Sequence, residues 1–249
     1  MSTGRDEHED LTQSPSAREA TYAFLAGAFC EPPSADLCAD AASASASASA
    51  DGGGCLPPAL AERIRSNAAS TSASPSGDGA DARREFMNLF KVPGPQYVTP
   101  YESVFRDTRD VAGRKVKGLL MGPSAVAVRK WYRLAALDIS PDYKDLPDHI
   151  AIEFGYLAHL CSKERAFAEA GNSAKLLRAR QMQRDFLAAH VVSWIHHLES
   201  RIHENTRHAY FMALATFAAE TADQNLAELE RALGPSARTA EPAYDGEAS

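Results

Sequence analysis

Residues 145–161 read DLPDHIAIEFGYLAHLC. Four of their apolar side chains follow one another at steps of four, three and four positions: Ile150, Phe154, Leu157 and Cys161. This spacing places all four on one face of an α-helix. Proline at the first turn of a helix costs no hydrogen bond, so we expect this helix to begin at Pro147 and to end near Glu164.

The residues around the start of this helix allow two interpretations. A carboxylate at Asp145 or Asp148 is expected to cap the helix, or to interact with the positive end of its dipole. His149 fits this pattern less well, because a protonated imidazole is disfavoured at that end. The segment is therefore either a capped helix start with an incidental histidine, or part of a binding site.

Helical spacing of apolar residues recurs along most of the chain. We expect helices over residues 17–30, 83–90, 124–137, 173–202, 205–221 and 226–233. Residues 93–105 contain three prolines in their first eight positions and are expected to form an extended loop. Valine, isoleucine and threonine are sparse and rarely alternate with polar residues, so no strand is predicted. The expected fold class is all-α.

The expected architecture is a single helical domain over residues 17–233 with one low-complexity insertion. The insertion covers about residues 39–81, where long runs consist mainly of Ala, Ser and Gly and offer little apolar surface to bury. We expect it to be flexible, with a short helix near residues 58–66. The polar ends, residues 1–16 and 234–249, are expected to be disordered tails.

The charge balance favours some partners over others. The chain has 249 residues and a net charge of −7. Binding to phosphate backbones needs clustered lysine and arginine, so no nucleic acid partner is expected. An acidic surface instead suits a basic partner, such as a cationic peptide.

The sequence also predicts a cytoplasmic location. The longest apolar run, residues 211–219, has nine positions, whereas a bilayer-spanning helix needs about 20, so no stable membrane insertion is expected. Residues 1–10 are polar and acidic and lack the pattern of a secretory signal. The four cysteines form no C-x-x-C pair and are expected to be reduced thiols.

Motifs for metal or nucleotide chemistry are missing. His203 and His208 are five positions apart, whereas the metalloprotease motif H-E-x-x-H needs four. No glutamate precedes a histidine by three positions, as a di-iron helical bundle requires. The triple glycine at residues 52–54 is not followed by the lysine of a phosphate-binding loop. We therefore predict no metal, no cofactor and no catalytic residue.

Four segments in the same order resemble the TorD/DmsD/NarJ family, whose members are dedicated chaperones of molybdenum-cofactor enzymes of the DMSO reductase superfamily. These segments are PYESVF at 100–105, MGPSAVAVRKWY at 121–132, LPDHIAIEF at 146–154 and FLAAHVVSW at 186–194. The resemblance covers residues 17–233 outside the insertion. The family often has two tyrosines where Trp131 and Tyr132 stand here.

The resemblance implies an all-helical chaperone that binds the apo-catalytic subunit of a molybdoenzyme and its N-terminal leader, a twin-arginine export signal. The chaperone would assist cofactor insertion and delay export until folding is complete. The client would be a periplasmic oxidoreductase of the DMSO reductase type. The expected peptide-binding residues are Glu102, Ser103, Phe105, Gly122, Trp131, Tyr132, Pro147, Asp148, His149 and Glu153. Of these, the three carboxylates are expected to meet the arginines of the leader.

Two other functions stay open. The first is a small helical enzyme that uses His149 and Glu153, four positions apart, as an acid–base pair. The second is a structural interaction protein in which the Asp-His segment only caps a helix. We expect mainly a monomer, and exchange of helices across the loop at residues 138–147 would give a domain-swapped dimer as the alternative.

Overall fold

Helices account for most of the chain. The computed structural model describes residues 11–34, 37, 56–70, 79–137 and 145–235. Its helices are α1 (Pro15–Cys30), α3 (Pro58–Ser70), α4 (Gly79–Phe86), α5 (Glu102–Arg106), α6 (Pro123–Leu134), α7 (Ile150–Glu169), α8 (Ser173–Phe186), α9 (Ile195–Asn205) and α10 (Ala209–Leu233), with two π-helical turns, η1 (Met87–Lys91) and η2 (Leu187–Val191). The predicted all-α fold class is confirmed.

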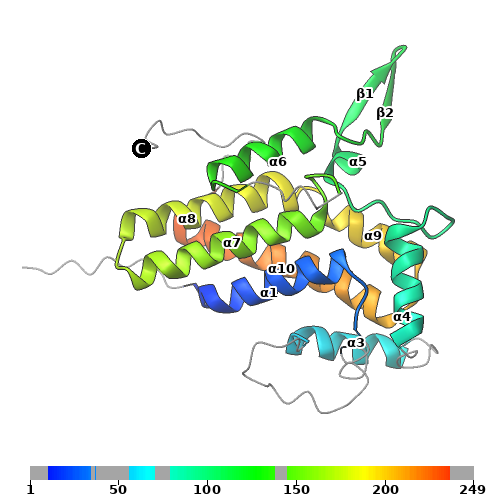
Figure 1. Cartoon of the computed structure of the whole chain (residues 1–249), viewed down its shortest axis with the longest axis horizontal. Helices are drawn as coiled ribbons and strands as arrows, with labels where there is room; N and C mark the ends of the chain where they lie inside the picture. Colours follow the sequence, from blue (N-terminus) through cyan, green and yellow to red (C-terminus); the bar gives the residue numbers. More distant parts are fainter. Residues whose placement is uncertain (1–10, 35–36, 38–55, 71–78, 138–144, 236–249) are drawn as a thin grey trace, which may run out of the picture.

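The long helices form a bundle in which α7 contacts both α1 and α8, and α10 contacts α3, α8 and α9. Figure 1 shows α1, α7, α8 and α10 running along the length of the molecule. In the same view α4 crosses one end of the bundle, α3 lies below it, and α6 lies above it. None of the described helices is long and apolar enough to span a bilayer.

Helix α7 packs most extensively against α1. The predicted apolar face of Ile150, Phe154, Leu157 and Cys161 is fully buried. Phe154 stacks on Tyr22 of α1, with the ring centroids 5.9 Å apart, and lies 6.0 Å from Phe29. Each such buried side chain contributes about 1.5–3 kcal/mol to folding. The contact between α1 and α7 is therefore built from large apolar side chains on both helices.

A buried ionic network joins α1, α7 and α8. Nη2 of Arg18 lies 2.6 Å from Oε2 of Glu164, and both side chains are buried. The amide of Gln183 donates to the same oxygen at 2.8 Å and accepts from Nη1 of Arg18 at 2.8 Å. Nε of Arg180 lies 2.8 Å from the other oxygen of Glu164. Each charge in the network has a partner, as burial requires.

Several predicted boundaries are wrong. Ser14 caps α1 by accepting from the N–H of Ala17 at 3.2 Å, so the helix begins at Pro15, inside the predicted tail. Inside the predicted insertion, α3 runs four residues past Ser66, and its apolar side chains at Leu60 and Ile64 are buried. Residues 38–55 and 71–78, most of both tails, and most of the loop at 138–147 lie outside the described residues.

The predicted helix over residues 173–202 is in fact two helices. The π-helical turn η2 follows α8, and Trp194 has left the helical conformation with φ −144°. The opposite error occurs at the end of the chain, where the two helices expected at 205–221 and 226–233 form the single helix α10. Asn225 does not break it, because its amide is buried and donates to the hydroxyl of Tyr22 at 2.9 Å.

The prediction of no strand is also wrong. Strands β1 (Thr108–Val111) and β2 (Arg114–Lys117) form an antiparallel hairpin. The two turn residues, Ala112 and Gly113, both have positive φ, at 53° and 78°. Such a turn matches the twist of a hairpin but is usually made by Asn-Gly or Asp-Gly. Alanine in the first position therefore hid the hairpin from the sequence pattern.

The buried network predicts an asymmetry between single and double substitutions. Glu164→Leu leaves Arg18 buried without a counter-charge and is expected to cost about 3–5 kcal/mol of unfolding free energy. The double variant Arg18→Met with Glu164→Leu removes the orphaned charge and is expected to recover most of that loss. Urea unfolding followed by circular dichroism measures both. The control is Arg165→Met, at a pair where the arginine is 40% exposed, and it is expected to cost less than about 1 kcal/mol. A double variant no more stable than Glu164→Leu would contradict the assignment.

Candidate functional site

Residues 100–103 are held against the start of α7 by the main chain and by Asp148. Oδ2 of Asp148 accepts from the N–H of Ser103 at 2.9 Å. The carbonyl of Asp148 accepts from the N–H of Glu102 at 3.0 Å, and the carbonyl of Pro100 accepts from the N–H of Ile150 at 3.0 Å. Asp148 therefore caps α5 and not α7, and the loop expected at residues 101–105 is instead mostly the short helix α5.

His149, and not a carboxylate, caps α7. The helix begins at Ile150, three residues later than predicted, and Nδ1 of His149 accepts from the N–H of Ala151 at 3.0 Å. Burial lowers the pKa of His149 to about 4, although the charge of Asp145 acts in the opposite direction. The imidazole is therefore neutral at pH 7. A neutral ring with a free lone pair fits the positive end of a helix, which explains why a histidine stands there.

Three fully buried carboxylates come from the junction of α5 and α7: Glu102 on α5, Asp148 before α7, and Glu153 on α7. Burial raises the pKa of Glu153 well above its usual range, and the charges of Glu102 and Asp148 raise it further. Burial also raises the pKa of Asp148, against the hydrogen bond from the N–H of Ser103 that lowers it. The region concentrates negative charge where water does not screen it.

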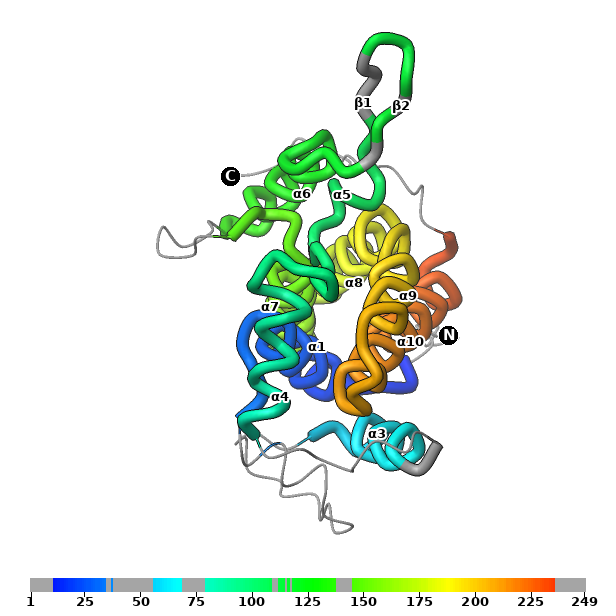
Figure 2. The backbone as a smooth tube through the Cα atoms, turned by 90° about the vertical axis from the view of Figure 1, so that its right-hand side faces the viewer, coloured from blue at the N-terminus to red at the C-terminus, as the bar shows by residue number. Residues whose placement is uncertain are grey.

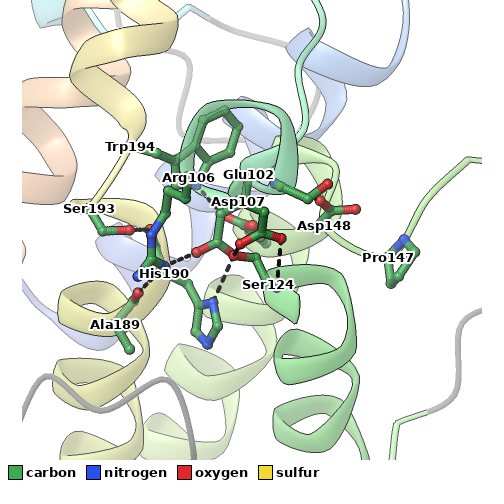
Figure 3. Close-up of polar contacts among 12 residues, drawn as sticks. Glu102, Arg106, Asp107, Ser124, Pro147, Asp148, Ala189, His190, Ser193 and Trp194 are labelled. Carbon is green, nitrogen blue, oxygen red and sulfur yellow. Dashed lines mark hydrogen bonds and ion pairs between the residues drawn. The ribbon is translucent and has the colours of Figure 1, made fainter. Parts of the chain in front are cut away.

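Positive and neutral donors come from α5 and from the end of α8 (Figure 3). Arg106 forms an ion pair with Glu102 and donates to the carbonyl of Ala189 at 2.6 Å. Nδ1 of His190 lies 2.8 Å from the other oxygen of Glu102. Nε1 of Trp194 donates to Oε2 of Glu153 at 3.2 Å. The π-helical turn η2 and the break after it thus place two groups, His190 and Trp194, against the carboxylates, and α5 supplies the third, Arg106.

Several atoms of this cluster keep unused hydrogen-bonding capacity. Among the described residues, five buried atoms of this cluster have no hydrogen-bond partner: Oγ of Ser103, Oδ1 of Asp148, Oε1 of Glu153, Nε2 of His190 and Nε1 of Trp131. Most buried polar atoms in proteins are paired, so such a concentration needs an explanation. Oδ1 of Asp148 is an acceptor, and Oε1 of Glu153 becomes one when that group is ionised, so both are suited to an added cationic donor group.

Gly122 lies in a second, adjoining cap. Oδ2 and Oδ1 of Asp107 accept from the N–H of Ser124 at 2.9 Å and from its hydroxyl at 2.7 Å, so Asp107 caps α6. A Cβ added at Gly122 would overlap the Asp107 carboxylate. Gly122 was predicted to contact a bound peptide. In the structure, its missing side chain leaves room for the Asp107 carboxylate that caps α6.

The aromatic candidates pack inside the same region. Trp131 and Tyr132 are buried, and the Tyr132 hydroxyl donates to the carbonyl of Pro147 at 2.9 Å. Phe105 is half-buried and stacks on Trp194, with ring centroids 5.5 Å apart.

The structure thus brings the ten predicted site residues together, but all except Phe105 are buried, and they do not line an open groove. Their role in peptide binding stays a prediction.

Four side chains of the site were not predicted from the sequence: Arg106, Asp107, His190 and Trp194, the last two of which lie in a segment that was recognised only for its resemblance. Arg106 stands four positions after Glu102, the spacing of an ion pair within a helix, but residues 101–105 were expected to be a loop.

A hollow of about 330 Å³ lies on the surface where α1 meets α7, lined by Gly27, Cys30, Ile152 and neighbouring side chains. In the described ranges, no group of three or more His, Cys, Asp or Glu side chains is placed so that it could hold a metal ion.

Comparisons with known proteins cover the four segments that resemble the TorD/DmsD/NarJ family. A family model described as nitrate reductase delta subunit matches residues 54–200, which include all ten predicted site residues. The chain is 30% identical over 111 residues to the chaperone protein TorD of Vibrio cholerae, covering 45% of each chain. It is 33% identical over 81 residues to the selenate reductase assembly chaperone protein of Thauera selenatis, covering 32% of this chain and 40% of that protein. The chlorate reductase assembly chaperone protein of Ideonella dechloratans is 28% identical over 119 residues, covering 47% and 55%. The chain spans about half the length of the curated relatives it matches.

Glu153→Gln is expected to stabilise the protein at neutral and alkaline pH. Because the pKa of Glu153 is raised on folding, the folded state holds more protons than the unfolded state above about pH 4.5, and stability falls as the pH rises. Glutamine removes the charge and keeps an oxygen for Trp194. We expect the melting temperature at pH 8 to rise by roughly 2–4 °C, and its fall between pH 5 and 8 to flatten. The exposed Glu204→Gln serves as control and is expected to change neither. A lower melting temperature for Glu153→Gln at pH 8 would show that the carboxylate is stably ionised.

Two glycine substitutions test the cap of α6. Gly122→Ala is expected to cost about 1–3 kcal/mol, because the new methyl group displaces the Asp107 carboxylate. Gly155→Ala, in the middle of α7 with no atom within 4 Å of the added Cβ, is expected to stabilise by about 0.5–1 kcal/mol. Urea unfolding measures both, and equal effects of the two variants would argue against a steric role for Gly122.

Proposed function

Because the chain belongs to the nitrate reductase delta subunit family, which is the TorD/NarJ family, we propose that it is a dedicated assembly chaperone for a molybdenum-cofactor oxidoreductase of the DMSO reductase superfamily. It binds the apo-form of the catalytic subunit and its twin-arginine leader in the cytoplasm, assists cofactor insertion, and delays export until folding is complete. The names of its relatives, which include assembly chaperones of selenate and chlorate reductases, support this class of client.

The observation that carries leader binding is the excess of buried carboxylates. Of the three carboxylates Glu102, Asp148 and Glu153, only Glu102 forms an ion pair with Arg106, and one oxygen each of Asp148 and Glu153 has no hydrogen-bond partner among the described residues. A guanidinium group supplies several donors in a planar fork and stays charged at any physiological pH. An arginine of the leader is therefore the group that best completes this cluster.

Access to the cluster runs through Arg106. Its side chain is 30% exposed, whereas Glu102 beneath it has no exposed surface. Helix α5 has only five residues and is held to the start of α7 by few hydrogen bonds, so a shift of this short element uncovers the carboxylates. Arg106 then occupies, in the free chaperone, the place that a leader arginine takes in the complex.

The apolar part of the leader needs apolar side chains near the cluster. Phe105, half-buried on the indole of Trp194, lies beside Arg106 in the sequence and becomes accessible with the same shift of α5. Burial of this ring against a leader side chain adds hydrophobic contact to the ionic one. The proposed site thus joins a charged end and an apolar end, as does the leader.

The enzyme alternative has weaker support. His149 and Glu153 are both buried, and Nδ1 of His149 is already occupied as the cap of α7. An acid–base pair must reach a substrate within hydrogen-bond distance, and neither group faces a described cavity. Turnover abolished by His149→Ala with leader binding intact would nevertheless establish it.

The leader site is tested by calorimetry with the full chain. The probes are synthetic leader peptides of molybdoenzyme subunits encoded in the same genome, each paired with a version in which both arginines are glutamine. We expect binding of the arginine form, and at least tenfold weaker binding of the glutamine form. Glu102→Gln and Asp148→Asn should each weaken it by about tenfold, since a charge-assisted hydrogen bond contributes about 1.5–3 kcal/mol. Arg106→Gln should tighten binding, because it removes the internal competitor.

Matched controls separate this from a loss of folding. Glu62→Gln and Glu204→Gln remove exposed carboxylates elsewhere and should leave the affinity unchanged, and circular dichroism checks that each variant is helical. Binding that is insensitive to Glu102→Gln and Asp148→Asn, or weakened by Arg106→Gln, would refute the proposed site. In that case the cluster serves only to hold α5 against α7.

A further inference from the structure

Exposed apolar side chains gather in one part of the molecule. Among the described residues, seven large hydrophobic side chains are exposed, and five of them fall between residues 116 and 134. These five are 38–55% exposed: Val116, Leu120, Met121, Val126 and Leu134. They come from strand β2, from the link after it, and from α6. Contiguous apolar patches on a soluble protein usually mark a binding surface.

Positive charge gathers in the same segment. Residues 108–134 contain seven lysines and arginines but one aspartate, in a chain whose net charge is −7. The side chains of Arg114, Arg129 and Arg133 are exposed. These three arginines form no ion pair with any described residue. Arg84 and Arg201, in contrast, each pair with a carboxylate of the same helix, so the charges of the three arginines in residues 108–134 are not neutralised in this way.

The apolar and basic side chains share one face of α6. Val126, Arg129, Arg133 and Leu134 follow the spacing of a single helical face, and all four are exposed. The opposite face, with Val128, Trp131 and Tyr132, is buried in the bundle. Leu120 and Met121 stand directly before the helix, so they extend the same surface toward the hairpin. We call the surface made by these six exposed residues, Leu120, Met121, Val126, Arg129, Arg133 and Leu134, the α6 face.

The hairpin β1–β2 makes the surface beside the α6 face uneven. Figures 1 and 2 show β1 and β2 projecting beyond the bundle, next to the start of α6. Val116 and Arg114 of β2 are exposed on this projection. Because the hairpin projects beside the helix, this surface fits a polypeptide that lies along α6 and contacts the hairpin better than it fits a flat bilayer.

We propose that the α6 face is a docking site for an acidic, amphipathic segment of a partner protein, separate from the leader site. The arginines complement carboxylates of the partner, and the apolar side chains cover its apolar face. A twin-arginine leader is excluded as the occupant, because its basic end is repelled by the same arginines. The chaperone thus carries two sites of opposite charge, one buried and acidic, the other exposed and basic.

Charge-matched peptides test this site on the full chain. Two fluorescent amphipathic helical peptides share one leucine pattern, and their polar positions are glutamate in one and lysine in the other. Fluorescence anisotropy is expected to detect binding of the glutamate peptide, weakened by salt, and none of the lysine peptide. Arg129→Glu with Arg133→Glu should weaken binding by about tenfold or more, and Val126→Ser with Leu134→Ser should also weaken it.

The controls identify the outcomes that overturn the proposal. Arg65→Glu with Arg201→Glu changes the net charge equally, at exposed arginines on α3 and α9, and should leave glutamate-peptide binding within twofold. Equal loss in this control, or binding of the lysine peptide, would refute a specific site. Phosphatidylglycerol vesicles that bind through Arg129 and Arg133 while the glutamate peptide does not would assign the face to a membrane. A dimer in sedimentation that the same substitutions dissociate would assign it to a second copy.

The leader assay keeps this proposal distinct from the proposed function. Leader affinity measured by calorimetry should be unchanged, within twofold, in the Arg129→Glu and Arg133→Glu variant. A large loss of leader affinity in that variant would show that the two sites are not separate. Failure of leader binding in the unmodified chain leaves the glutamate-peptide result independent, because different residues carry it.

Discussion

Asp148 is the residue on which the site depends, because it joins two segments that are far apart in the sequence. Its side chain and its main-chain carbonyl accept hydrogen bonds from the first two N–H groups of α5. The next residue, His149, caps α7. One dipeptide therefore fixes the starts of two helices, and the positions of Glu102 and Glu153 follow from it. The Asp-His pair is better explained as a junction between helices than as a surface motif.

The sequence predicted the long helices well where one face is apolar. The stripe on α7 is buried as expected, and the family resemblance of four segments is confirmed by the match over residues 54–200. What it missed depends on tertiary contacts. The buried bond from Asn225 to Tyr22 keeps α10 continuous, and Arg106 belongs to the site only because α5 is helical. Neither follows from local periodicity.

The sequence predicted which residues make up the candidate site, but it did not predict that nearly all of them are buried. The sequence positions of acidic and aromatic residues do not show that the side chains of Glu102, Asp148 and Glu153 are all buried, because burial depends on which elements cover them. The overall charge was similarly a poor guide to local charge. A net charge of −7 favours a basic partner for the whole chain, yet the exposed side of α6 is basic. Averages over the chain hide opposite charges on different faces.

The π-helical turn η2 has a consequence for the length of the chain around it. A π-helical turn holds one residue more than an α-helical turn, so deletion of a single residue within η2 would convert it to an α-helical turn and change the direction of the side chains inside the turn. Two contacts of the site come from this turn: His190 lies against Glu102, and the carbonyl of Ala189 accepts from Arg106. The number of residues in this turn is therefore as strict a requirement as their identity.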